Sequence, residues 1–195
     1  MQSISEALGL AFALVLSGDR DLLEIVVLSL QVSLTATLIA CLIGFPIGAL
    51  VAIGRFRGRN AILILMNALM GLPPVVVGLL VYLHLSRSGP LGFLGLLYTP
   101  TAMIIAQVIL ITPIVIALSR QVLEELNAHY DEQLRSLGVH GLEKASTLLY
   151  EARHALLTVL LAGFGRAISE VGAVIIVGGN INHVTRVMTT TIALE

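Results

Sequence analysis

The stretch IVVLSLQVSLTATLIACLIGFPIGALVAIG, residues 25–54, contains no Asp, Glu, Lys or Arg. A helix needs about 20 mainly apolar residues to cross the roughly 30 Å hydrocarbon core of a bilayer. Residues 60–86 and 88–119 also lack charged side chains over sufficient length. These three stretches predict transmembrane helices over about 25–53, 61–84 and 99–119.

A fourth apolar run, about 155–177, is long enough to span but contains Arg166 and Glu170. Near the end of the chain, TTTIALE (189–195) has the character of the start of a fifth span, so the C-terminus looks truncated. Backbone polar groups must be paired inside lipid, and the alternating segments of a barrel are absent from the sequence. The chain is therefore predicted to be a single all-α integral membrane domain over residues 1–195.

The overall composition supports a membrane protein and argues against several other classes. Hydrophobic residues make up 57% of the chain, charged residues 12%, and the mean hydropathy is +0.98. The net charge of -1 gives no reason to expect nucleic acid, and the lone Cys41 can form neither a disulfide framework nor a metal site. The beginning MQSISE lacks the basic region of a signal peptide, and the short apolar run 7–16 predicts a helix lying in the interface.

Basic residues predict the orientation, because short cytoplasmic loops are enriched in Lys and Arg. Seven lie in the two segments that would share one side of the membrane: Arg55, Arg57, Arg59, Arg120, Arg135, Lys144 and Arg153. Three lie on the other side: Arg20, Arg87 and Arg186. We therefore expect the N-terminus outside and residues 120–154 in the cytoplasm.

The predicted cytoplasmic loop, about 120–154, has the pattern of two short helices. Its apolar positions recur at spacings of three and four, which indicates one buried face, while Asp131, Glu132 and Arg135 should face water. These apolar positions are Leu123, Leu126, Tyr130, Leu134 and Leu137. Gly138 is placed to end the first helix, and a second is expected over about 142–150. A plain alternative is a solvated hairpin that only connects two spans.

No pattern of catalytic residues supports an enzyme. Lys144 is the only lysine and follows no glycine-rich loop, so the chain cannot cradle ATP phosphates as a P-loop does. The sequence contains neither HExxH nor GxSxG, and its five histidines lack ligand spacing.

Two stretches resemble a known family. YDEQLRSLGVHG, residues 130–141, resembles the EAA loop of permease subunits in ATP-binding-cassette importers, with Glu132 six positions before Gly138. TLLYEARHALLTVLLAGFGRAISEVGAVIIVGGN, residues 147–180, is similar to the segment after that loop in molybdate, tungstate and sulfate permeases, tungstate permeases above all. The sequence departs from the family at Gln133 and Leu134, where two alanines are usual, and near Glu151, where a proline is usual.

The resemblance implies the permease core of a type I importer, moving tungstate or molybdate by alternating access. It implies a second permease copy, two ATPase subunits that use ATP and Mg, and an extracytoplasmic oxyanion-binding protein, in a bacterial or archaeal inner membrane. The chain itself would bind no cofactor. The ATPase would contact the loop residues Asp131, Glu132, Leu134, Arg135, Leu137 and Gly138.

Arg166 and Glu170 lie four residues apart within the fourth apolar run, which predicts an ion pair. They either fix helix packing or, with Ser169, line an oxyanion path or its gate. Asn67, Gln107 and Thr112 are further polar candidates, each for a path or for a hydrogen bond between helices. Two other classes stay open: a membrane scaffold that recruits a partner through the loop, and a secondary transporter, for which internal repeats are missing.

Overall fold

The described part of the chain is helical and contains no strand, as the sequence predicts. The computed structural model describes residues 18–54 and 56–194. The helices of this part are α2 (Arg20–Ile53), α3 (Arg59–Met70), α4 (Pro74–Leu85), α5 (Pro100–Ser136), α6 (Gly141–Glu151), α7 (Arg153–Ile168), α8 (Gly172–Gly178) and α9 (Met188–Leu194), with a 3-10 turn η1 (Gly92–Leu94) before α5. The predicted interfacial helix over 7–16 lies outside the described residues.

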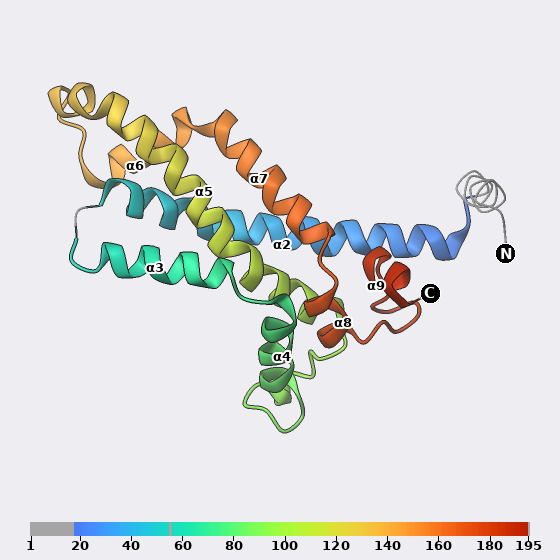
Figure 1. The fold of residues 1–195 in the computed structure, drawn as a ribbon. Coiled ribbons are helices and arrows are strands. Elements are labelled where there is room, and N and C mark those ends of the chain that lie inside the picture. Colours follow the sequence, from blue (N-terminus) through green and yellow to red (C-terminus); the bar gives the residue numbers. More distant parts are fainter. Residues whose placement is uncertain (1–17, 55, 195) are drawn as a thin grey trace.

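The helices α2 and α5 form the frame of the molecule and cross each other near its middle (Figure 1). Each begins at a capping side chain: Asp19 accepts a hydrogen bond from Leu22 N at 3.0 Å, and Thr99 accepts one from Ala102 N at 3.5 Å. At 34 and 37 residues, these helices are roughly 51 and 56 Å long. Both are long and apolar enough to cross a membrane.

Small residues let α2 and α5 approach closely. A Cβ atom added to Gly44 would lie 2.7 Å from Val115 Cγ1, and one added to Gly48 would lie 2.2 Å from Ser119 Oγ. The GFPIG motif of α2 therefore packs against α5 of the same chain, which accounts for it without a dimerisation role.

The second predicted span is not one continuous helix. It divides into α3 and α4, whose axes are bent by 98°. Gly71 ends α3, and Pro73 and Pro74 follow; a residue before proline is disfavoured in the helical conformation, and Pro73 is extended with ψ 130°. The prolines were visible in the sequence, but their effect is a break rather than the expected kink.

The fourth predicted span is also broken. Its parts α7 and α8 are bent by 58° across Ser169, Glu170 and Val171. The described residues thus contain two continuous helices of spanning length, or up to four spans if each bent pair counts as one. The expected count of four lies at the upper end of this range.

The third predicted span and the first loop helix are one element. The helix α5 continues without interruption from Pro100 to Ser136, so the boundary expected near residue 119 does not exist as a break. The second loop helix is α6, close to the expected 142–150. Together, the end of α5 and α6 form a helical hairpin over residues 120–151, called the hairpin below (Figure 1).

Candidate functional site

An ion-pair cluster holds the two arms of the hairpin together. Asp131 on α5 pairs with Lys144 on α6, and its other oxygen lies 3.0 Å from Arg135 Nη2. The Lys144 side chain is only 12% exposed, and that of Asp131 is 26% exposed. Asp131 was expected to face water; it is half-buried, and its carboxylate joins α5 to α6, whereas Glu132 and Arg135 are exposed as expected.

The turn of the hairpin depends on Gly138, as the sequence predicts. Gly138 has φ 74°, a left-handed conformation that glycine adopts without steric cost. Around it, Val139 N donates to Leu134 O at 2.9 Å and Gly138 N donates to Arg135 O at 3.0 Å. These two bonds form a Schellman motif, which satisfies carbonyls at the end of α5.

The apolar face of the hairpin follows the predicted pattern except at its tip. Leu123 and Leu134 are buried in the core, as expected. Leu137, however, is 70% exposed, because α5 ends beside it and the chain turns away. Leu142 on α6 is 76% exposed. The tip thus presents two large apolar side chains to the surroundings.

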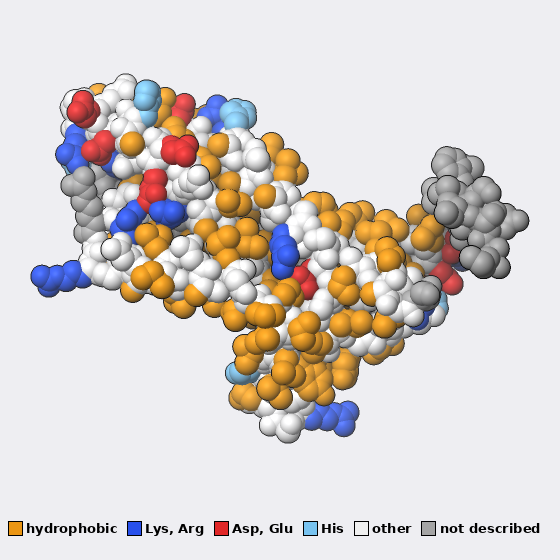
Figure 2. Space-filling model, viewed as in Figure 1, with side chains coloured by type: hydrophobic (Ala, Val, Ile, Leu, Met, Phe, Trp, Pro, Cys, Tyr) orange, Lys and Arg blue, Asp and Glu red, His pale blue; other side chains and the backbone are white. Residues whose placement is uncertain are grey.

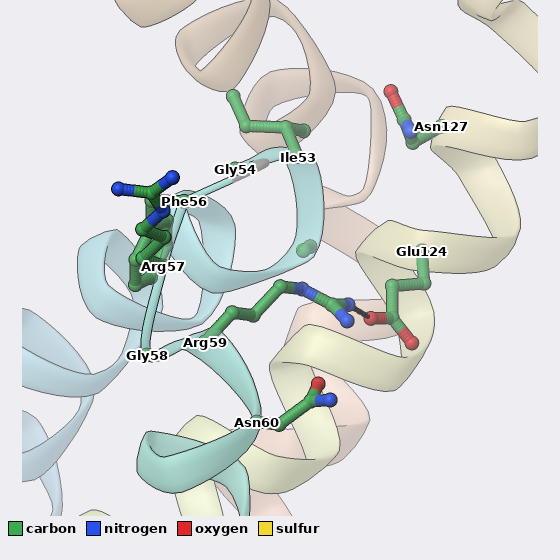
Figure 3. Close-up of a pocket in the computed structure, with 10 residues that line it drawn as sticks. Ile53, Gly54, Phe56, Arg57, Gly58, Arg59, Asn60, Glu124 and Asn127 are labelled. Carbon is green, nitrogen blue, oxygen red and sulfur yellow. Dashed lines mark hydrogen bonds and ion pairs between the residues drawn. The ribbon is translucent and has the colours of Figure 1, made fainter.

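A second polar network lies at the base of the hairpin (Figure 3). Arg59, in the first turn of α3, reaches Glu124 on α5, which also pairs with Arg120 at 2.7 Å. The Arg59 Nε atom donates to Val51 O at 2.9 Å, near the end of α2. Arg59 therefore ties α3 to both α2 and α5, beside a cavity of about 730 Å³.

Sequence reasoning missed this network around Glu124. Its members are separated by 65 positions along the chain, and each looked like an ordinary charge at the end of a span. The only available signal was the concentration of arginines at residues 55–59.

At the break in the fourth span, Arg166 and Glu170 do form the predicted pair, with 3.5 Å between Arg166 Nη2 and Glu170 Oε2. They do not share one continuous helix, since α7 ends at Ile168. Glu170 is 6% exposed, and its other oxygen accepts a hydrogen bond from Ala173 N in the first turn of α8, whereas Arg166 is 45% exposed. Ser169, the third candidate, is the residue at the C-terminal end of α7, and its hydroxyl donates to Arg166 O of the same turn.

The other polar candidates differ in whether they link two helices. Gln107 donates to Ala167 O at 3.0 Å and thereby links α5 to α7, as expected for a hydrogen bond between helices. Thr112 donates to Val108 O within its own helix, so it makes no such link. Asn67 is exposed on α3.

Among the described residues, one group of side chains has atoms of the kinds that bind metal ions. Asp21, Glu24 and His183 have ligand atoms within 4.8 Å of one another, and all three are exposed. His183 Nδ1 lies 2.9 Å from Glu24 Oε2, so this group forms a surface contact between α2 and the loop before α9.

Packed apolar helices, two of them long and apolar enough to cross a membrane, with a polar hairpin at one end, are the features of a helical membrane protein. The chain belongs to the family described as binding-protein-dependent transport system inner membrane component, which matches residues 44–193. Members of this family are transport components rather than enzymes.

Three relatives illustrate the similarity. The chain is 42% identical over 194 residues to the tungstate uptake system permease protein TupB of Peptoclostridium acidaminophilum, covering 100% of this chain and 85% of that protein. It is 41% identical over 186 residues to a probable anion ABC transporter permease protein of Haloferax volcanii, covering 91% and 80%. It is 40% identical over 141 residues to TupB of Campylobacter jejuni, covering 72% and 59%. Sulfate and molybdenum permease proteins match at lower identity.

Proposed function

We propose that this chain is the membrane-spanning permease subunit of an ATP-driven importer for a tetrahedral oxyanion. Tungstate is the first candidate substrate, because two of the three relatives described above are named for its uptake, and molybdate is the second. Two copies would form the path, two ATPase subunits would hydrolyse ATP with Mg, and a separate binding protein would deliver the anion from outside.

The observation that carries the proposal is the rigid attachment of the hairpin to a membrane helix. The helix α5 runs unbroken from the apolar core to the turn at Gly138, and the pair between Asp131 and Lys144 fixes α6 against it. A push on the tip of the hairpin is therefore passed along one helix into the membrane domain, as coupling to an ATPase requires.

The tip has the chemistry of a docking surface. Leu137 and Leu142 are exposed apolar side chains, and Glu132 and Arg135 near the end of α5 are exposed charges. Burial of the two leucines in a groove of an ATPase would contribute about 1.5–3 kcal/mol for each. In this mechanism, closure of the ATPase pair draws the two hairpins together and turns the spans so that the path opens outward.

Arg166 supplies the positive charge for the path. In a single copy it is 45% exposed within an apolar surface, whereas Glu170, its partner, is buried. A charged side chain at this depth normally faces a bundle interior or an aqueous path. A path between two copies would give Arg166 such surroundings and an anion to attract.

The test is to purify the full-length protein from native membranes in mild detergent, as wild type and as Gly138→Pro. Proline cannot adopt the φ of 74° found at this position, and it also removes the hydrogen bond from Gly138 N to Arg135 O. We expect an ATP-binding-cassette ATPase to co-purify with the wild type and to be lost from Gly138→Pro, as measured by mass spectrometry and by ATP hydrolysis of the eluate.

Gly95→Pro is the matched control, because Gly95 also has positive φ, 60°, and donates a similar hydrogen bond to Gly92 O, but lies in the loop before α5. It should retain the ATPase. If the ATPase stays bound to Gly138→Pro, the hairpin is not the docking element. If no ATPase accompanies the wild type, the alternative applies: a membrane scaffold that recruits another cytoplasmic partner.

A further inference from the structure

The break between α7 and α8 is held by side chains and backbone from several other elements. Gln107 on α5 donates to Ala167 O, a carbonyl in the last turn of α7. Thr189 on α9 donates to Glu170 O at 3.0 Å. Ser29 on α2 accepts a hydrogen bond from Met188 N at 2.9 Å, which fixes the start of α9 beside the break.

Of the side-chain amide of Gln107, only the nitrogen makes a hydrogen bond within the described part of the chain. A backbone carbonyl can only accept, so the atom of Gln107 that faces Ala167 O must be the amide nitrogen. The oxygen Oε1 therefore points the other way, where it is buried and finds no hydrogen-bond partner among the described residues. The residue is 3% exposed, so bulk water does not satisfy this atom. An unpaired buried acceptor is costly.

Gln107 also lines a small cavity. This cavity measures about 10 Å³ and is lined by both polar and apolar residues: Ser29, Val32, Ser33, Met103, Gln107, Ala167, Ile168, Glu170, Val174, Val187 and Thr189. A cavity needs roughly 10–15 Å³ and a few polar neighbours to hold one water. This cavity has the polar neighbours that a water requires and is far too small for an oxyanion.

We propose that Gln107 is a positioning residue for the broken span. Its amide nitrogen holds the end of α7, and its oxygen binds one water in the cavity beside Glu170. These two links fix the bend between α7 and α8, and the bend sets the place of Arg166 relative to the path. The inference rests on the proposed function for its role in transport, but not for its structural part.

The structural part is tested on the purified permease alone, by hydrogen–deuterium exchange of residues 165–175. Gln107→Met keeps the length and volume of the side chain but removes both polar atoms. We expect the amides of Ser169, Glu170 and Ala173, which are hydrogen-bonded at the break, to exchange roughly fivefold to tenfold faster. Gln107→Glu keeps the shape of the side chain and in its protonated form still donates one hydrogen bond, so at a pH where it is protonated it should restore slow exchange.

The matched control is Thr37→Val, which removes a buried hydroxyl that bonds only within its own helix, to Ser33 O. It should leave exchange at the break unchanged. Unchanged exchange in Gln107→Met would overturn the positioning role. If Thr37→Val accelerates exchange as much, the effect is general loosening of the bundle and the role is likewise overturned.

The water is tested through Met103, which lines the cavity and is 0% exposed. Hydroxyl radicals formed from a bound water by X-ray irradiation should oxidise Met103 in the wild type and not in Gln107→Met. An unlabelled Met103 in the wild type would overturn the bound water.

The transport part is tested by uptake of tungstate into vesicles that contain the permease and its ATPase, with the binding protein of the system added outside. We expect Gln107→Met to lower uptake several-fold while the ATPase still co-purifies, and Gln107→Glu to recover it. Faster exchange with unchanged uptake would overturn the link between the bend and transport. If the wild type takes up neither tungstate, molybdate nor sulfate, the proposed function fails, whereas the exchange and labelling results still decide the role of Gln107.

Discussion

At the scale of the residue, the contact between α2 and α5 depends on the absence of side chains. A Cβ atom at Gly48 would lie 2.2 Å from Ser119 Oγ and 3.2 Å from two backbone atoms of α5, Arg120 N and Ile116 O. The hydroxyl can rotate away, but the backbone of α5 cannot yield without shifting the whole helix. Glycine is therefore a packing requirement here, although it is a poor helix former elsewhere.

We predict that Gly48→Ala lowers the free energy of unfolding by about 1–3 kcal/mol, the usual cost of overpacking a tight interface. Thermal unfolding of the purified protein in mild detergent measures the change. Gly165→Ala is the control, since Gly165 also lies inside a helix but a Cβ atom there meets nothing within 4 Å. It should leave stability unchanged or raise it by up to about 1 kcal/mol. Equal effects of the two substitutions would contradict the packing role.

At the scale of the element, the start of α2 is joined to the loop between α8 and α9 through His183. The hydrogen bond to Glu24 and its negative charge raise the pKa of His183 above the usual value, with a further increase from Asp21 and an opposing effect of Arg186. The folded protein therefore binds this proton more tightly than the unfolded chain. The stabilisation is fully present below the unfolded pKa of about 6.5 and is lost as the pH rises through the raised pKa.

We accordingly predict that Glu24→Gln brings the pKa of His183 back toward 6.5 and removes the corresponding pH dependence of stability. Titration of the His183 ring signals by NMR measures the pKa, and melting temperatures between pH 5 and pH 8 report the stability. Glu125→Gln, another exposed carboxylate far along the chain, is the comparison and should change neither. A pKa that stays raised in Glu24→Gln would show that other groups hold the proton.

The elements also show what the sequence could and could not predict. Length and apolar character identified α2 and the apolar part of α5, because a long uncharged run leaves a strong local signal. The sequence signals for the helix end at Gly138 and for α6 were equally local. The break in the fourth span was not local: this span contains no proline, and its bend is held by Gln107 and Thr189, which are distant in sequence. The contact between Asp131 and Lys144 was hidden for a similar reason, because the two residues lie on different helices.

At the scale of the whole molecule, charge is separated from apolar surface. Figure 2 shows charged side chains gathered mainly at the end that carries the hairpin, while hydrophobic side chains cover most of the middle of this face. Large apolar side chains are exposed on almost every helix, among them Leu42, Ile64 and Leu161. Such a surface is compatible with lipid and with a second copy. Arg166 departs from this separation, since its side chain is 45% exposed at the broken span.

If Arg166 serves a path between two copies, its removal should affect transport but not assembly. We predict that Arg166→Gln abolishes uptake of tungstate in vesicles while the ATPase still co-purifies and still hydrolyses ATP at its basal rate. Glu170 is buried and would be left without its cationic partner, so some loss of stability is also expected. Melting temperature must therefore be measured in the same preparation.

The double variant Arg166→Gln with Glu170→Gln separates the two roles. Removing both charges relieves the unpaired carboxylate, so a pair that only fixes packing should regain stability and uptake together. A pair that serves the path should regain stability while uptake stays absent, because the positive charge that attracts the anion is still missing. Arg87→Gln, which removes an exposed arginine from the loop after α4, should behave as the wild type throughout. Recovery of uptake in the double variant would assign Arg166 to the packing of the bundle and leave the path to other residues.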